Sequence, residues 1–230
     1  MNNRDERTGE QVQENESAIM QLFADAGAIV TGGHFVYNSG RHSSVYVNKD
    51  ALYLHTSVTR QLCERMATPF DADLVDVVVG PVLGGIILAQ WVTAALNARR
   101  TTGETLAVYA EKEDAPTGSQ FSFRRGYDAH IAGKRILVVE DILTTGGSAR
   151  KVIELVRQHD GMVIGLSALC NRGGVHTHDV GDVPLSTLVS LPLDTYTEEE
   201  CPFCRQGVPV NTGLGKGKAF LARKAERNKQ

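Results

Sequence analysis

The sequence predicts an α/β protein with a mostly parallel central sheet, flanking helices and a small N-terminal hood. Short apolar runs of strand length alternate along the chain with longer helical patterns, which is typical of parallel sheets. Two of these runs end in glycine-containing loops that lead directly into a helical segment. The 230 residues, 22% charged and 42% hydrophobic, suit one such domain with a small appendage.

The first third of the chain predicts a helix followed by the hood. Residues 1–15 are polar and indicate a frayed lead-in. Residues 16–27 carry apolar side chains in a helical stripe that ends at Gly27, a typical helix C-cap. Residues 29–54 are rich in Gly, Ser and Asn with short alternating runs, which favours a β hood over a second domain. We therefore divide the chain into a helix and hood (1–55), a core (56–195) and a tail (196–230).

In the core, helices and strands are expected to alternate. Helical patterns are found at residues 56–70, 86–98 and 148–159, and strands are expected at 74–79, 106–110, 135–139, 162–169 and 185–191. Residues 80–85 predict a loop and 113–120 a polar stretch. The apolar run at 135–139 favours a strand buried on both faces, which places it in the middle of the sheet.

The most informative motif follows this central strand. Two adjacent acids, Glu140 and Asp141, precede an apolar pair and then a loop of small residues: Thr144, Thr145, Gly146, Gly147 and Ser148. Open α/β sheets bind ligands at the carboxyl ends of their strands. Two carboxylates there can accept hydrogen bonds from vicinal sugar hydroxyls, and the loop and helix N-terminus suit a phosphate. The motif predicts a ribose 5-phosphate site. The alternative is a strand–helix turn that binds no ligand. Such a turn would not require the second acid.

A second strand–loop–helix junction spans residues 77–86 and contains Leu83, Gly84 and Gly85. Glycines without side chains let the backbone approach a ligand, and the following helix offers free N–H groups to an anion. A Walker-type nucleotide loop is excluded, because the sequence contains no Gly-x-x-x-x-Gly-Lys-Ser/Thr.

Together these motifs resemble those of the type I phosphoribosyltransferases, which use phosphoribosyl pyrophosphate (PRPP). The resemblance implies that Glu140 and Asp141 bind the ribose hydroxyls and that residues 144–148 bind the 5-phosphate. It also implies that the backbone at residues 83–85 and Lys112 bind the pyrophosphate. Lys112, Glu140 and Asp141 are then the expected catalytic residues. Magnesium is expected to arrive with PRPP, bound by substrate oxygens.

Within the family, two segments resemble the members that act on orotate. Residues 33–46 match their hood, with Ser39, Arg41 and Tyr46 as expected substrate contacts. Residues 168–174 contain Arg172, which would pair with the orotate carboxylate; a surface arginine is the alternative. The implied reaction joins orotate to PRPP and gives orotidine 5′-monophosphate and pyrophosphate, a step of pyrimidine nucleotide synthesis. A transferase for a purine or another oxo-base, and a non-catalytic PRPP-sensing regulator, stay open as alternatives.

The chain departs from the family in its positive charge. Gly84 and Asn38 stand where many orotate enzymes carry lysine, and residues 111–119 contain only Lys112. Arg124 and Arg125 follow this segment and are expected to supply the missing charge. The resemblance implies a homodimer in which the segment is a lid that reaches into the neighbouring subunit's site. A lid over its own site stays the alternative.

The tail contains Cys201 and Cys204 in a Cys-x-x-Cys pair. The pair is either half of a zinc site, completed by Cys170 and His176 or His178, or two reduced structural thiols, which we favour because the family needs no zinc. Residues 214–230 are basic and predict a solvated or partly helical tail.

Composition bounds the location and the partners. Four cysteines do not make a disulfide scaffold, and residues 1–16 have no apolar signal region, so we expect a cytoplasmic protein. No apolar segment approaches the ~18 residues of a membrane span, so no membrane partner is expected. The net charge of −3 argues against a dedicated nucleic-acid binder.

Overall fold

The structure is a computed structural model, and it describes residues 16–115 and 118–227. The chain forms two compact units, each made of two separate segments. Among the described residues, the first unit joins residues 16–21 to Tyr53–Pro192, and the second joins Leu22–Leu52 to residues 193–227. Residues 16–25 are helical. Among the described residues, no helix has the length and apolar character needed to cross a membrane.

A six-stranded sheet forms the centre of the first unit, in the order β10-β9-β8-β5-β6-β7. All neighbouring strands are parallel except the β6–β7 pair, which is antiparallel. The strands are β5 (Val77–Pro81), β6 (Leu106–Ala115), β7 (Gly118–Ser122), β8 (Arg135–Leu143), β9 (Met162–Asn171) and β10 (Leu185–Ser190). The predicted fold class is confirmed, and β8 lies between two parallel partners, as its apolar run indicated.

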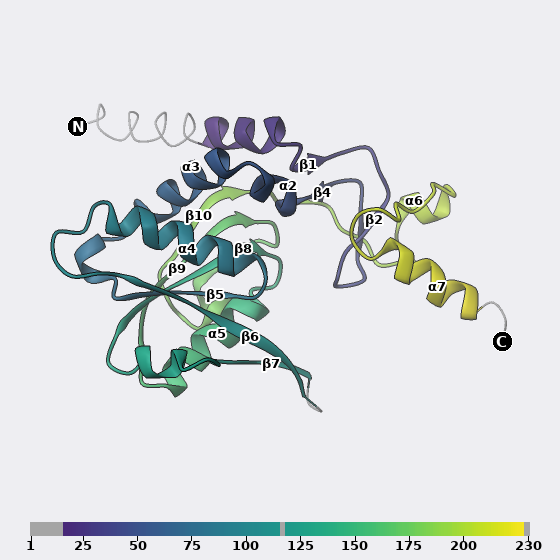
Figure 1. The fold of residues 1–230 in the computed structure, drawn as a ribbon. Helices are drawn as coiled ribbons and strands as arrows, with labels where there is room; N and C mark the ends of the chain where they lie inside the picture. The colour runs from purple at the N-terminus through teal and green to yellow at the C-terminus, as the bar shows by residue number, and fades with distance from the viewer. Residues whose placement is uncertain (1–15, 116–117, 228–230) are drawn as a thin grey trace, which may run out of the picture. The chain divides into compact units, whose positions relative to one another are not determined.

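Helices cover both faces of this sheet. Figure 1 shows α3 (Thr56–Ala67) and α4 (Gly84–Asn97) on one face and α5 (Gly147–Gln158) on the other. Three short 3-10 helices connect elements of this unit: η1 (Ala72–Leu74), η2 (Tyr127–His130) and η3 (Thr177–Val180). Residues 77–79 of β5 and 136–139 of β8 are buried almost completely, so the two strands form the middle of the hydrophobic core.

An ion-paired corner fixes the start of β8. The Asp76 carboxylate accepts hydrogen bonds from the Arg135 backbone N–H (2.9 Å), Nε (3.0 Å) and Nη2 (2.8 Å), and Arg100 Nη2 lies 3.7 Å from its Oδ1. The hydrogen bonds from Arg135 lower the pKa of Asp76 to about 2. Asp76 directly precedes β5, and Arg135 is the first residue of β8. The hydrogen bonds between them therefore hold the first residues of the two strands next to each other.

No strand was expected in the polar stretch at residues 113–120, but its described residues belong to two strands. β6 continues to Ala115 and pairs with β7, from Glu111 opposite Ser122 to Ala115 opposite Gly118. Backbone pairing between the two strands maintains this ribbon, so its residues form a sheet without the apolar pattern that marks a buried strand.

The second unit combines the hood with the tail of the chain. Short antiparallel pairs join β1 (Ile29–Val30) to β4 (Tyr46–Val47) and β2 (Phe35–Val36) to β3 (His42–Ser43). Its helical parts are α6 (Pro202–Arg205), α7 (Gly217–Arg227) and most of α2 (Lys49–Leu54).

Backbone hydrogen bonds connect the two segments of this unit. His42 and Tyr196 exchange a pair of them, at 2.8 and 2.9 Å. The N–H of Asn211 donates to the His34 carbonyl (2.8 Å), and the N–H of Lys216 donates to the Val36 carbonyl (2.7 Å). The basic tail is therefore a structural partner of the hood, and its helical part is α7.

Candidate active site

The loop between β8 and α5 forms a small polar hollow. Gly146 precedes α5 with a φ of 73°, and a Cβ on this residue would lie 2.8 Å from Val180 Cγ1. The loop therefore needs glycine here for both conformation and space. The hollow has a volume of ≈ 90 Å³ and is lined by Glu140, Ile142, Leu143, residues 144–148 and Ala149. The N-terminal amides of α5 border it, so its surroundings suit an anion.

The acid pair is buried at the end of β8. Glu140 and Asp141 are each 7% exposed. Glu140 Oε1 accepts the Asp141 N–H at 3.1 Å, and Asp141 Oδ1 accepts the Ile142 N–H at 2.7 Å. Glu140 lines the hollow beside the loop, whereas Asp141 is outside its lining. The two carboxylates therefore occupy different positions around the strand end, as adjacent residues of a β-strand do.

The end of β9 crosses this loop at very short range. The N–H groups of Arg172 and Gly173 both donate to the Leu143 carbonyl, at 2.9 and 3.1 Å. A Cβ on Gly173 would lie only 1.5 Å from the Thr144 carbonyl oxygen, so no other residue fits without moving the loop. This approach lets Arg172 Nη2 donate to Thr144 Oγ1 at 3.0 Å. The structure thus brings Arg172 to the predicted phosphate loop.

Gly173 is a site residue that the sequence analysis did not identify. Its signal was the Gly-Gly pair directly after Arg172, which marks a close approach of two backbones only when the partner loop is known.

The second junction is built by two glycines that pack against each other. A Cβ on Gly80 would lie 2.1 Å from the Gly85 carbonyl oxygen, and one on Gly85 would lie 2.7 Å from the Gly80 carbonyl carbon. Gly85 therefore has a structural role, since it lets α4 begin against the end of β5. Gly84 is buried, whereas Leu83 is 80% exposed, and the Val82–Leu83 peptide bond is cis.

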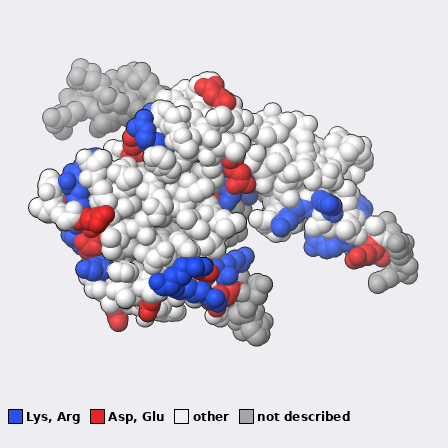
Figure 2. All heavy atoms as spheres, in the orientation of Figure 1, with Lys and Arg blue, Asp and Glu red and all other residues white. Residues whose placement is uncertain are grey.

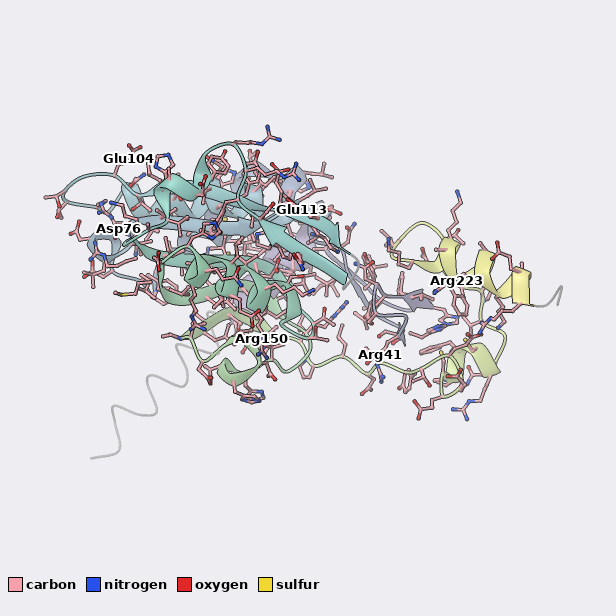
Figure 3. All side chains as sticks on the ribbon, turned by 90° about the horizontal axis from the view of Figure 1, so that it is seen from below. Arg41, Asp76, Glu104, Glu113, Arg150 and Arg223 are labelled. Atoms are coloured by element: carbon pink, nitrogen blue, oxygen red, sulfur yellow. The ribbon has the colours of Figure 1, made fainter. Side chains whose placement is uncertain are left out.

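The three predicted cationic residues lie on or beside the β6–β7 ribbon. Lys112 is exposed on β6. Arg124 pairs with Glu113 and Arg125 with Glu111, both at 2.9 Å. Hydrogen bonds from Ser122 and then Arg124 lower the pKa of Glu113. Figure 2 shows basic and acidic side chains intermixed near the ribbon, and Figure 3 labels Glu113 on it. Exposed pairs of this kind are weak, so both arginines can exchange their partners for an anionic ligand.

The predicted hood contacts Ser39, Arg41 and Tyr46 belong to the second unit. Arg41 donates to Thr195, from Nε to Oγ1 (2.8 Å) and from Nη2 to the carbonyl oxygen (2.5 Å). Ser39 and Arg41 line a hollow of ≈ 840 Å³ that also includes Arg223 of α7; Figure 3 labels both arginines. The Tyr46 ring packs beside Phe35, with centroids 5.5 Å apart.

A cluster of histidine and cysteine side chains lies inside the second unit. The ligand atoms of His34, His42, Cys201 and Cys204 are all within 4.8 Å of one another. Burial, followed by the charge of His34, lowers the pKa of His42. Burial, followed by Cys201, raises the pKa of Cys204 to about 11.

The partners that we considered for a zinc site at the Cys-x-x-Cys pair are therefore wrong, whereas the structure leaves our preference for two reduced thiols untested. Cys170 is buried in β9, where burial raises the pKa of its thiol to about 12, and the rings of His176 and His178 stack on each other with centroids 5.6 Å apart. None of the three is in the cluster. His34 and His42 take their place because the hood is hydrogen-bonded to the tail, a pairing between segments about 160 residues apart that local sequence patterns do not encode.

Comparison with known proteins gives three kinds of similarity. Residues 57–183 match a family described as the phosphoribosyl transferase domain. An orotate phosphoribosyltransferase of Caldicellulosiruptor bescii is 36% identical over 196 residues, which cover 85% of this chain and 95% of that protein. The orotate phosphoribosyltransferase structure from Aeropyrum pernix has a TM-score of 0.58 and 26% identity, covering 74% of this chain and 92% of that one.

A structure of the Mycobacterium tuberculosis H37Rv orotate phosphoribosyltransferase was solved in complex with 5-phospho-α-D-ribosyl 1-diphosphate. It has a TM-score of 0.53 at 22% identity and covers 77% of this chain and 96% of that chain. At this level of identity the similarity supports the fold alone.

Proposed function

Because this chain belongs to the phosphoribosyltransferase family, we propose that it is an orotate phosphoribosyltransferase. The enzyme transfers the 5-phosphoribosyl group of PRPP to orotate and releases pyrophosphate and orotidine 5′-monophosphate. One observation carries the proposal. The buried acid pair, the small-residue loop and Arg172 meet at the carboxyl end of β8, within a chain that aligns with orotate enzymes over most of its length.

In this proposal the 5-phosphate binds the loop at residues 144–148. A cavity that holds a single water has a volume of about 10–15 Å³. The hollow of ≈ 90 Å³ therefore has room for a phosphate group. The backbone amides at the start of α5 and the hydroxyls of Thr144, Thr145 and Ser148 supply donors without a fixed positive charge. The helix dipole adds a favourable potential at the same point.

Glu140 and Asp141 hold the ribose. Their carboxylates accept hydrogen bonds from vicinal hydroxyls, and their negative charge stabilises the cationic, oxocarbenium-like sugar that develops as pyrophosphate leaves. The ring nitrogen of orotate that attacks the ribose loses its N–H proton as the new bond forms. An oxygen of the departing pyrophosphate can accept this proton, so no strong general base from the protein is required. The site works mainly by holding both reactants in line.

Arg172 sets the base specificity. A guanidinium fork matches the planar carboxylate of orotate, which purine bases and uracil lack. Its hydrogen bond to Thr144 Oγ1 supports this role, because it holds the guanidinium beside the loop assigned to PRPP. Ser39, Arg41 and Tyr46 of the hood are proposed as further substrate contacts.

The pyrophosphate is assigned to the backbone at residues 83–85 together with Lys112, Arg124 and Arg125. Among the described residues, the β8 hollow is lined by backbone amides, hydroxyl groups and one carboxylate, that of Glu140. One carboxylate is too few to hold a divalent cation with protein ligands alone. This donor set fits magnesium that is held by PRPP oxygens, as this ion prefers. When bound, magnesium neutralises charge on the pyrophosphate leaving group.

We also propose that the enzyme is a cytoplasmic homodimer with shared sites. All four cysteines are free, which suits a reducing compartment. A shortage of positive charge near the β8 loop motivates the shared site, because PRPP carries two phosphate-containing groups. The β8 loop contains no cation, whereas Lys112, Arg124 and Arg125 lie on or beside the projecting β6–β7 ribbon. On a ribbon, these cations can reach a second subunit.

Subunit mixing tests the shared site. An Asp141→Asn protein and a Lys112→Ala/Arg125→Ala protein are each expected to be nearly inactive. Mixed under exchange conditions, they should form heterodimers with one intact site and recover activity. If mixing restores nothing although exchange is demonstrated, the ribbon acts on its own subunit.

A panel of acceptor bases tests the function itself. With PRPP and magnesium, the enzyme should consume orotate and release one pyrophosphate per orotidine 5′-monophosphate formed, and it should leave hypoxanthine, xanthine and uracil unchanged. Turnover of a purine instead would place the chain among the purine transferases. Binding of PRPP without turnover of any base would support the alternative of a non-catalytic PRPP-sensing regulator.

A further inference from the structure

The four-residue cluster in the second unit has the composition of a structural metal site. His34, His42 and Cys201 are at most 1% exposed, and Cys204 is partly exposed. Their ligand atoms lie within 4.8 Å of one another, although they come from segments about 160 residues apart in the sequence. Two imidazoles and two thiols that converge in a buried space have few uses in the absence of a metal ion, and His42 Nε2 has no hydrogen-bond partner among the described residues.

The distances in the cluster match the edges of a tetrahedron around zinc. With Zn–S bonds of about 2.3 Å and Zn–N bonds of about 2.05 Å, a regular tetrahedron has S···N edges of about 3.6 Å and an N···N edge of about 3.3 Å. Three of the four S···N distances are 3.6, 3.7 and 3.5 Å, and all four ligand atoms lie within 4.8 Å of one another. The two ring nitrogens are 2.8 Å apart, so they need to separate by only about half an ångström.

The surroundings of His34 also fit metal binding. His34 presents Nε2 to the cluster, while its Nδ1 lies 2.9 Å from the Val208 carbonyl oxygen. A histidine that binds a metal usually donates its other ring N–H to a carbonyl or a carboxylate, which fixes the tautomer. His42 presents Nδ1, and its ring packs edge-on against Phe220 of α7 at 4.8 Å between centroids.

We propose that His34, His42, Cys201 and Cys204 bind one zinc ion that holds the hood to the C-terminal segment. Two sulfur and two nitrogen donors in a tetrahedral arrangement are typical of zinc. Four protein ligands leave no open position, so the ion is structural and takes no part in the transfer reaction. This inference is independent of the activity proposed above.

The size of the second unit explains why such an ion is useful. Its two segments contain 31 and 38 residues, and its strands are two residues long. A unit of this size buries little apolar surface, and proteins of this size commonly use a metal or disulfides as a cross-link. A disulfide between Cys201 and Cys204 would only close a loop within one segment. Zinc bound to both histidines cross-links the hood and the tail.

Metal analysis of the full-length chain tests the proposal. The protein is purified without a histidine tag, under reducing conditions, and its zinc is measured by mass spectrometry against protein concentration. We expect about one zinc per chain, with full occupancy also in Cys170→Ala and His178→Ala. These two controls remove residues that the sequence suggested but that lie outside the cluster. Cys204→Ser and His34→Ala should lose the metal, with zinc content falling at least tenfold.

Cobalt substitution provides a readout that does not depend on the variants folding. Cobalt(II) in the wild-type chain should give the intense visible bands of a tetrahedral ion and a sulfur-to-metal charge-transfer band, and zinc should displace it. A wild-type chain that contains no zinc and binds neither ion would overturn the proposal. So would full zinc content in a folded Cys204→Ser protein, or zinc lost from Cys170→Ala but kept in Cys204→Ser.

Discussion

Replacing Asp76 with asparagine tests how the corner at the start of β8 contributes to stability. Hydrogen bonds from Arg135 are the largest cause that lowers the pKa of Asp76, from the ordinary 3.8 to about 2. One pKa unit corresponds to about 1.4 kcal/mol, so the charged carboxylate contributes about 2 kcal/mol to the free energy of unfolding near neutral pH. The Asp76 side chain is 24% exposed, and water weakens its interaction with Arg135. We therefore use about 2 kcal/mol, slightly less than the pKa shift alone would give.

The sign follows from the direction of the shift. Asp76 holds its proton less tightly in the folded protein than in the unfolded chain. Its contribution is therefore complete above the unfolded pKa near 3.8 and is lost as the pH falls towards the folded pKa of about 2. Asp76→Asn should lower the free energy of unfolding by about 2 kcal/mol at pH 7, or about 4–8 °C in Tm for a chain of this length. Between pH 4 and pH 2 the difference from wild type should shrink.

Urea unfolding of the two proteins at pH 7, 5, 4 and 3 measures this difference. Glu104→Gln, at an exposed acid in the same unit, is the control and should change stability little at any of these pH values (Figure 3). A difference between Asp76→Asn and wild type that stays constant from pH 7 to pH 3 would refute the electrostatic origin. Equal stability of the two proteins at pH 7 would refute the contribution itself.

Three further predictions concern the candidate active site. Asp141→Asn should keep the fold, measured by circular dichroism, but sharply reduce kcat/KM for PRPP, because a carboxylate facing the cationic ribose is lost; unchanged kinetics would remove Asp141 from the site. Arg172→Ala should cost about 2–4 kcal/mol in kcat/KM for orotate and much less in PRPP affinity, the range for losing one partner of a buried charged pair. Equal losses for both substrates would place Arg172 outside the base site. Gly173→Ala should impair binding of both substrates, because its Cβ would lie 1.5 Å from the Thr144 carbonyl oxygen; calorimetric titration with PRPP measures this, and normal PRPP affinity would show that the loop moves without cost.

The sequence was most predictive where the decisive information is local. The strand at 135–139, the acid pair and the loop at 144–148 follow one another without a break, so burial pattern and turn chemistry together indicated β8 and α5. The β6–β7 ribbon was missed because its residues are polar. Phe121 of β7 packs against the hydrophobic core but stands alone among polar residues, so the ribbon lacks the alternation of apolar residues from which a strand is recognised.

The histidine–cysteine cluster shows why the remainder could not be predicted. Cys-x-x-Cys is visible in the sequence, but its partners depend on which distant segment pairs with the tail. Cys170, His176 and His178 are nearer in sequence and were therefore the natural candidates. The actual neighbours, His34 and His42, become evident only from the hydrogen bonds that join His42 to Tyr196 and His34 to Asn211.

This pairing also connects the proposed zinc ion to residues assigned to the substrate. His42 stands between Arg41 and Ser43, whose side chains donate to Thr195 and Asp194, next to the Tyr196 that pairs with His42 itself. A metal bound at His42 therefore restrains the start of β3, which directly follows Arg41. Loss of zinc should loosen this part of the hood first, so it should weaken substrate binding in the second unit while the sheet of the first unit, which contains none of the four ligands, keeps its own core.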